Sequence, residues 1–209
     1  MLAGRALDVL VANAGMAPTL YDTSPQGHEL AFATNVLGHH LLFRKVQPHL
    51  ATGARVVILT GDIYCRSQAC TPDYRYQGSK GCMLAYCRSK LGNLWQAQQL
   101  QERHPELIVA AVHPGVISSN LGSSPKSESK GAEKKVSRLR FDLRIDCELG
   151  AQTTLWCATA ADVVAGGYYH NAYGLMDLRA TDPARNEQAA RTLWETCEQL
   201  CGKWLSSPS

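Results

Sequence analysis

Short apolar runs alternate along the chain with longer stretches in which apolar positions recur at helical spacing. The runs that predict β-strands lie at residues 6–11, 55–60, 107–112 and 168–170, and the first reads as a buried strand. The stretches that predict helices lie at residues 26–50, 82–103, 149–160 and 183–200. Residues 64–80 are polar and contain Pro72 and Gly78, which predicts a loop. Strands that alternate with helices predict an α/β fold around a parallel sheet.

The composition fits one globular domain over residues 1–209. Hydrophobic residues make up 45% of the 209 positions, enough for a sizeable core. The formal net charge of +3 is too small to argue for nucleic acid, and no Cys/His group has the spacing of a zinc finger. We therefore expect a small molecule as the ligand, with neither nucleic acid nor a bound metal.

The eight cysteines are scattered, with no Cys-x-x-Cys pair and no secretory leader. This pattern favours a reducing, intracellular compartment in which the cysteines are apolar residues without redox chemistry. No window offers the roughly 18 uncharged apolar residues that a membrane span requires. We therefore expect a cytoplasmic protein, or one that is peripheral to a membrane.

Tyr86 and Lys90 are the most informative residues of the chain. They lie four positions apart in the predicted helix 82–103, which places both side chains on one helical face. A nearby positive charge favours the phenolate form of tyrosine, so the pair can act as a general acid or base toward a carbonyl or hydroxyl group. Because the same spacing occurs in many unrelated proteins, its surroundings decide its meaning.

Three further motifs surround this pair. Asn-Ala-Gly at residues 13–15 ends the first apolar run, Asn-Val-Leu-Gly occupies residues 35–38, and His-Pro-Gly-Val at residues 113–116 ends another run. In this order, and together with Tyr86-x-x-x-Lys90, they resemble the short-chain dehydrogenase/reductase family over nearly the whole chain. Residues 84–93 and 150–154 are most similar to its retinol-dehydrogenase and WW-domain oxidoreductase branch.

The resemblance implies a role for each motif. Tyr86 would transfer a proton to or from the substrate oxygen, while Lys90 lowers the pKa of the tyrosine and holds the nicotinamide ribose. Asn35 would be the third catalytic residue and hold a water molecule in the proton relay, although an asparagine within a helix can also mark a bend. NAD or NADP would be the cofactor. Besides Tyr86 and Lys90, the residues implied to contact it are Asn13, Ala14, Gly15, Pro114, Gly115, Val116 and Ser119.

A polar and basic segment at residues 123–140 lacks sustained helical periodicity, which predicts a mobile loop. Its position after the Pro-Gly motif is that of a substrate lid in the family, and a merely solvated loop is the equal alternative. Basic residues such as Lys134 and Arg138 beside apolar Leu139 and Phe141 leave a peripheral contact with anionic lipid as a third interpretation.

Two departures from the family pattern bear on activity. Gly61 stands where relatives carry the catalytic serine, and Thr60, one residue earlier, is expected to point to the other side of its strand. Losing one hydrogen bond to a developing charge typically costs on the order of 10² to 10³ in rate. The chain also shows no glycine-rich turn that would receive the cofactor pyrophosphate at a helix N-terminus.

Set against the family, the sequence corresponds to the C-terminal part of a Rossmann-like, doubly wound parallel sheet whose first three strands are missing. Residues 7–11 would then form an open sheet edge, which favours pairing with another chain. The resemblance thus implies a homo- or hetero-oligomer as well as a truncated domain.

Two functions stay open at this point. The first is an oxidoreductase that transfers hydride between NAD(P) and a lipophilic alcohol or carbonyl compound, such as a retinoid or a steroid. The second is a catalytically inactive, truncated paralogue or isoform that acts through protein–protein contacts. The retained Tyr86, Lys90 and Asn35 favour the enzyme, whereas Gly61 and the absent glycine turn favour the alternative.

Overall fold

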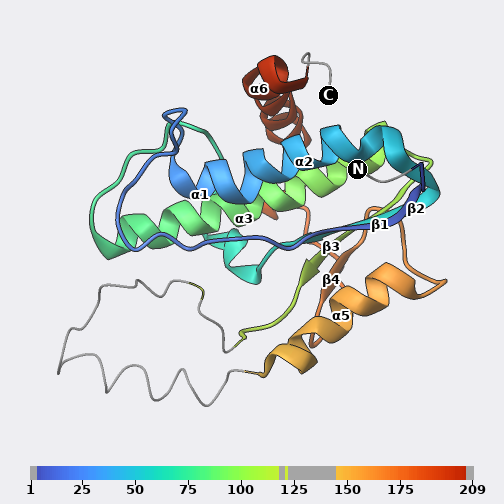
Figure 1. Cartoon of the computed structure of the whole chain (residues 1–209). Coiled ribbons are helices and arrows are strands. Elements are labelled where there is room, and N and C mark those ends of the chain that lie inside the picture. Colours follow the sequence, from blue (N-terminus) through green and yellow to red (C-terminus); the bar gives the residue numbers. More distant parts are fainter. Residues whose placement is uncertain (1–3, 118–120, 122–144, 206–209) are drawn as a thin grey trace.

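The computed structural model describes residues 4–117, 121 and 145–205. These residues form an α/β fold on one five-stranded sheet with the strand order β1-β2-β3-β4-β5 (Figure 1). The strands are β1 (Leu7–Ala12), β2 (Leu50–Leu59), β3 (Ile108–His113), β4 (Tyr168–His170) and β5 (Gly174–Leu175). The pairs from β1 to β4 are parallel, and β5 runs antiparallel to β4. The predicted α/β fold with a mainly parallel sheet is therefore confirmed.

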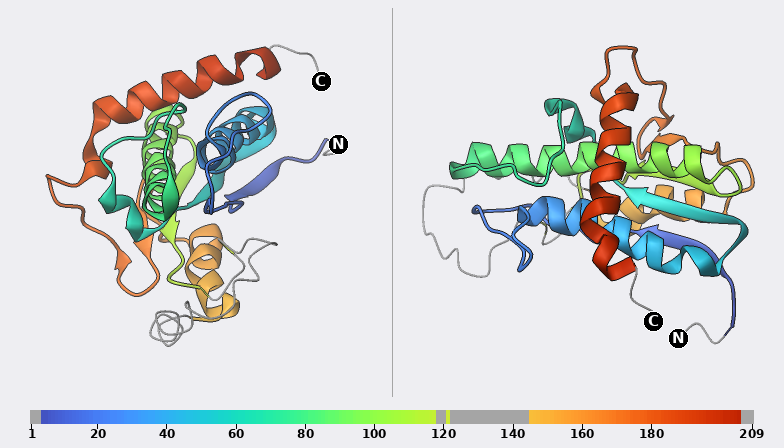
Figure 2. Two further views of the ribbon diagram at one scale, coloured as in Figure 1. Left: turned by 90° about the vertical axis from the view of Figure 1, so that its left-hand side faces the viewer. Right: turned by 90° about the horizontal axis from the view of Figure 1, so that it is seen from above.

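Helices cover both faces of this sheet (Figures 1 and 2). On one face lie α2 (Gly38–Val46) and the long α3 (Gly78–Arg103), and on the other lies α5 (Cys147–Thr159), which packs on β2 and β3. The last helix, α6 (Glu187–Leu205), crosses over α2 and α3 on the outside. The carboxyl ends of β2 and β3 thus lie between two helical layers.

The two central strands show why their residues form buried strands. Successive side chains of a strand point to opposite faces. On β2, Val56 and Ile58 join the larger core cluster, beneath α2 and α3, whereas Val57 and Leu59 belong to the smaller cluster with Cys157 of α5. Because both faces are covered, β2 reads as a continuous apolar run instead of an alternating one.

The helix predicted over residues 26–50 is present over residues 30–49, but it begins later and its backbone is not α-helical throughout. The backbone enters a short α1 (Leu30–Phe32), passes through a π-helical turn η1 (Ala33–Leu37), continues as α2 and closes in the 3₁₀ turn η2 (Gln47–His49). The carboxylate of Glu29 starts the helix by accepting hydrogen bonds from the amides of Ala31 and Phe32. A π turn within a helix commonly marks a functional site.

Other element boundaries also differ from the sequence prediction. The predicted loop at residues 64–80 overlaps the 3₁₀ turn η3 (Asp62–Arg66) at its start, and α3 begins at Gly78 instead of residue 82. The last predicted helix is divided between the 3₁₀ turn η4 (Pro183–Arg185) and α6. The apolar run of the first strand predicts burial, yet Val9 and Val11 are 38% and 39% exposed. Their exposure follows from the place of β1 at the edge of the described sheet, the edge position that the comparison with the family predicts.

All eight cysteines fall within the described residues, and none forms a disulfide. Most are buried, as expected for apolar helix residues. None of the helices in residues 4–117 and 145–205 combines the length and the apolar character needed to cross a bilayer.

We predict that Gly92→Ala destabilises the fold, although alanine is the better helix former. A Cβ at Gly92 in α3 would lie 2.7 Å from Cys70 Sγ and 3.0 Å from Val36 Cγ2, so the packed core would have to move. The expected loss is about 1 to 3 kcal/mol in the free energy of unfolding, measured with urea. Gly202→Ala in α6 is the matched control, because nothing lies within 4 Å of its Cβ position, and should gain about 0.5 to 1 kcal/mol. Equal effects at both sites would contradict the packing described here.

Candidate active site

Tyr86 and Lys90 lie on one face of α3, as their spacing predicts. The ring of Tyr86 is half-buried and Lys90 is buried. The ammonium nitrogen of Lys90 lies 5.7 Å from the centre of the Tyr86 ring. The phenol and the ammonium are therefore neighbours on the carboxyl-end side of the sheet, next to the end of β2.

Two oxygen atoms hold the Lys90 side chain. Its Nζ donates a hydrogen bond to the carbonyl of Leu59, the last residue of β2, at 3.0 Å, and a longer one to Asn93 Oδ1 at 3.4 Å. Burial removes the ammonium from water and lowers the pKa of Lys90 from 10.5 to about 8. The bond to Leu59 fixes α3 against the exit of the central strand.

The pKa of Tyr86 differs from the expectation. Burial, and to a smaller extent Cys87 and the carboxylate of Asp62, raises this pKa from 10.0 to about 12. The spacing to Lys90 predicts a lowered pKa, but burial moves the pKa of Tyr86 in the opposite direction. Tyr86 is therefore a protonated phenol at neutral pH, which suits a proton donor.

Asn35 lies at the centre of the π turn and is fully bonded. Its Oδ1 accepts from the amide of Met16 at 2.8 Å, and its Nδ2 donates to the Met16 carbonyl and to Ser89 Oγ, each at 2.9 Å. Its carbonyl accepts from Asn93 Nδ2 at 2.6 Å. In this structure Asn35 thus joins the loop after β1 to α3 through direct bonds.

The loop at residues 13–15 reaches the same place from β1. Asn13, Ala14 and Gly15 are exposed directly after the strand end. A Cβ at Gly15 would lie 3.5 Å from Asn35 Oδ1 and 3.6 Å from Lys90 Nζ, so the bare backbone lies next to the polar cluster. Glycine leaves room there for a ligand to approach the ammonium.

The third predicted segment, residues 114–116, follows β3. Pro114 and Gly115 are half-buried and Val116 is exposed. Gly115 has a φ of 92°, and a Cβ there would lie 2.8 Å from Ile145 Cδ1, so this turn requires glycine. Ser119 and the predicted loop at residues 123–140 lie outside the described residues.

Gly61, at the position of the expected serine, leaves room for a side chain. Its backbone is extended, and the atoms nearest to a built Cβ are His113 Nδ1 at 3.8 Å, Ile63 Cγ2 at 3.9 Å and Lys90 Cγ at 4.0 Å. The hydroxyl of Thr60 donates to the Lys90 carbonyl at 2.8 Å and is buried. The Thr60 hydroxyl is thus buried and already hydrogen-bonded to the backbone of α3, so it does not replace the serine.

Some residues of the site were not found from the sequence. Ser89 bonds Asn35 and the carbonyl of Tyr86, and Asn93 bonds both Lys90 and Asn35. Asn93 is three positions after Lys90 on the same helix, a spacing that could have indicated it. The proximity of His113 to Asp62 and His170 depends on strand register, for which the sequence holds no local signal.

Comparison with known proteins identifies the class. Residues 3–174 match the family model described as Enoyl-(Acyl carrier protein) reductase, a short-chain dehydrogenase family. The chain belongs to the short-chain dehydrogenase/reductase family. Retinol dehydrogenase 14 of Mus musculus is 29% identical over 204 residues, which cover 94% of this chain and 59% of that protein. WW domain-containing oxidoreductase of Homo sapiens is 30% identical over 217 residues, which cover 97% of this chain and 51% of that protein.

Solved structures agree with this assignment. An uncharacterized protein from Mycobacterium paratuberculosis matches with a TM-score of 0.68 at 27% identity, over 94% of this chain and 68% of that chain. NADPH-bound carbonyl reductase from chicken fatty liver matches with a TM-score of 0.57 over 85% of this chain and 68% of that chain, and at 16% identity this likeness shows the fold alone. The chain spans about three fifths of the length of retinol dehydrogenase 14.

The lowered pKa of Lys90 has a consequence for stability. Between pH 8 and pH 10.5 the folded chain binds fewer protons at Lys90 than the unfolded chain does, so this group makes the free energy of unfolding rise with pH in that window. Lys90→Met removes the titrating amine. We predict that urea unfolding of the variant lacks this contribution, so that the difference from the parent chain changes between pH 8 and pH 10.5.

Nuclear magnetic resonance of the labelled lysine side chain gives the direct control. The amine of Lys90 should titrate near pH 8. A Lys90 midpoint at the ordinary value of 10.5, together with a pH-independent difference between parent and variant, would show that the amine is hydrated and not held at Leu59.

Proposed function

We propose that this chain carries the catalytic half of an oxidoreductase that transfers hydride between NAD or NADP and an alcohol or carbonyl carbon. One observation supports it above the others: the Tyr86–Lys90 pair of α3 and the distant Gly15 meet beside the carboxyl ends of β1 and β2. Ligands of open α/β sheets bind at that edge. The membership of the family points to the same chemistry.

The residues at this edge fit the nicotinamide end of such a cofactor. The bare backbone at Gly15 gives access to Lys90 Nζ, a cation whose two present partners are neutral oxygens. An ammonium so placed keeps a third N–H, beyond those bonded to Leu59 and Asn93, that can donate to a ribose hydroxyl. The bound nicotinamide would supply or accept the hydride. The described residues offer no glycine-rich helix start for the pyrophosphate, so the contribution of this chain lies at the nicotinamide end.

Tyr86 is the proton carrier in this proposal. Its raised pKa keeps the phenol protonated at neutral pH, so it donates to a carbonyl oxygen that is receiving negative charge. In the reverse direction the phenol must accept a proton from an alcohol, which requires the phenolate form. Reduction is therefore the direction that this arrangement favours at neutral pH.

The substrate we propose is a lipophilic aldehyde or ketone, or the matching alcohol. The support comes from the retinol dehydrogenases among the relatives. A serine at position 61 would donate a second hydrogen bond to the substrate oxygen, beside the one from Tyr86. Gly61 cannot donate it, so turnover should be slow.

A non-catalytic role in binding another protein chain is the second candidate. The exposed apolar side chains of Val9 and Val11 along edge strand β1 favour it, since such an edge can pair with another chain. Absence of any detectable hydride transfer by the parent chain, with an oligomer in light scattering, would support this alternative over the enzyme.

The first test of the enzyme is Tyr86→Phe. The parent chain is mixed with NADH or NADPH deuterated at the transferred position and with hydrophobic aldehydes and ketones, and deuterium in the product alcohol is measured by mass spectrometry. We predict that Tyr86→Phe lowers the transfer by about 10² to 10⁴, since the phenylalanine ring has no proton to give. Tyr173→Phe, at a position that is 75% exposed, is the matched control and should transfer at the parental rate. Full activity of Tyr86→Phe would exclude Tyr86 as the proton carrier.

The second test restores the missing hydroxyl. Gly61→Ser places Oγ beside Lys90 and His113 without backbone strain, because the φ of Gly61 is −172° and its Cβ position is open. We predict an increase in kcat for carbonyl reduction of up to about 10² to 10³. Gly61→Ala fills the same space without the hydroxyl and should leave kcat near the parental value. If serine and alanine change the rate equally, Gly61 does not occupy the position of a catalytic hydroxyl.

A further inference from the structure

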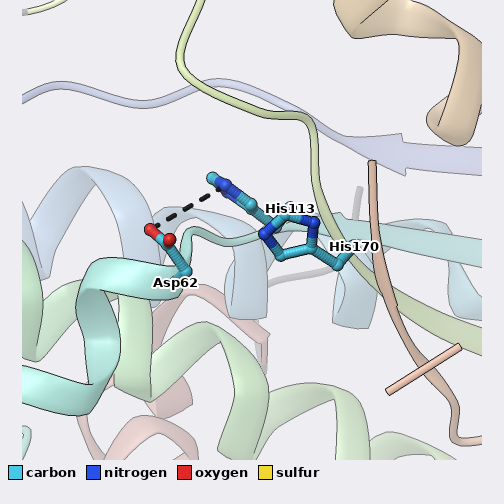
Figure 3. A group of neighbouring side chains, drawn as sticks. All are labelled: Asp62, His113 and His170. Atoms are coloured by element: carbon cyan, nitrogen blue, oxygen red, sulfur yellow. Dashed lines mark ion pairs between the residues drawn. The ribbon is translucent and has the colours of Figure 1, made fainter. Parts of the chain in front are cut away.

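Asp62, His113 and His170 gather at the ends of three neighbouring strands. Asp62 begins η3, three residues after β2 ends, while His113 and His170 are the last residues of β3 and β4 (Figure 3). The parallel register pairs His113 directly with His170. One ligand atom from each of the three side chains lies within 4.8 Å of the others.

The two rings and the carboxylate face a common space. His113 Nε2 lies 3.8 Å from Asp62 Oδ1, and the two imidazole rings lie edge to face with their centres 4.6 Å apart. His113 is buried, His170 is half-buried and the side chain of Asp62 is 64% exposed. The group therefore has a buried floor and one side open to solvent, which gives an ion a way in.

We propose that Asp62, His113 and His170 form a binding site for a divalent transition-metal ion of the zinc class. Two imidazoles and one carboxylate suit such an ion, whereas Mg²⁺ and Ca²⁺ prefer oxygen ligands. Three protein ligands leave at least one position of a tetrahedral ion for water. The site does not rest on the proposed enzymatic function.

The ligand atoms must come closer together, and the structure permits this. Ligands of tetrahedral zinc lie about 3.4 Å from one another, given metal–ligand distances of about 2.0 to 2.2 Å. Asp62 is exposed and can rotate toward the rings. The ring of His113 is not fixed by a hydrogen bond, since its Nδ1 is buried without a partner among the described residues. Small side-chain rotations thus bring three donors to one ion.

His170 carries the main cost of binding. Its Nδ1 accepts from the amide of Ala172 at 3.0 Å, which leaves the proton on Nε2. Coordination through Nε2 moves that proton to Nδ1 and gives up the bond to Ala172. One neutral hydrogen bond contributes only a small fraction of the free energy of zinc binding, so the exchange favours the ion.

The charged groups around the three ligands are compatible with binding of a cation. Asp62 supplies a negative charge on the Nε2 side of His113. His113 Nδ1 and the Cγ of Lys90 flank the space at Gly61, and the ammonium of Lys90 is bonded to the Leu59 carbonyl and Asn93 Oδ1.

The test is a calorimetric titration of the tag-free chain with ZnCl₂ at neutral pH. Because Cys65 and Cys147 are exposed and thiolates also bind zinc, both are first changed to serine, and this Cys65→Ser/Cys147→Ser chain is the reference. We expect one zinc ion per chain with micromolar or tighter affinity, and no heat from MgCl₂. CoCl₂ should give the visible absorption of tetrahedral cobalt without a thiolate charge-transfer band.

Asp62→Asn and His170→Gln are the decisive variants, because both side chains reach the surface and can change without opening the core. Each should weaken zinc binding by about 10- to 100-fold or more. Removing a residue that only hydrogen-bonds to a metal ligand already lowers affinity by about that factor, and these variants remove a ligand itself. His104→Gln is the matched control: His104 also lies beside a carboxylate, with Nδ1 3.2 Å from Glu106 Oε1, but belongs to no group of three ligands among the residues that the structure describes. It should bind as the reference does.

Two outcomes would overturn the proposal. The first is a folded reference chain, shown by circular dichroism, that takes up no zinc at micromolar concentrations. The second is zinc binding that Asp62→Asn and His170→Gln leave unchanged. Neither outcome bears on hydride transfer by Tyr86, and loss of that activity would leave the zinc result standing.

Discussion

The hydrogen bond from the buried ammonium of Lys90 to the carbonyl of Leu59 is the interaction on which the rest of the site depends. A buried charge is costly unless it is bonded, so Lys90 needs acceptors within reach. Leu59 provides one at the end of the central strand, and Asn93 provides another from the next turn of the same helix. This need holds α3 in one position along β2, and it places Tyr86 beside the sheet end.

The same polar cluster connects the other parts of the site. Asn93 bonds the carbonyl of Asn35, and Asn35 bonds Met16 and Ser89. The π turn, the loop after β1 and α3 therefore share one hydrogen-bond network. A buried network of this kind specifies its geometry because a buried polar group without a hydrogen-bond partner destabilises the fold. The cluster explains why Gly15 lies beside Lys90 although the two are far apart in sequence.

The sequence predicts the fold class and the closeness of Tyr86 to Lys90 well, because both rest on local patterns. The apolar runs of β2 and β3 and the four-residue spacing of Tyr86 and Lys90 needed no tertiary information. The π turn at Asn35 was missed, since its cause is a set of bonds to distant residues. The raised pKa of Tyr86 was also missed, because its main cause is burial, which a spacing in the sequence does not show.

The central claim is that the space beside Gly15 and Lys90 receives the nicotinamide end of a cofactor. The most direct measurement is a crystal structure of the chain soaked with nicotinamide mononucleotide, which avoids any need for a pyrophosphate site. We expect ribose hydroxyls within hydrogen-bonding distance of Lys90 Nζ and Tyr86 Oη, the third N–H of the ammonium donating to the ribose. A soaked crystal in which the nucleotide lies away from Lys90 and Tyr86 would contradict this.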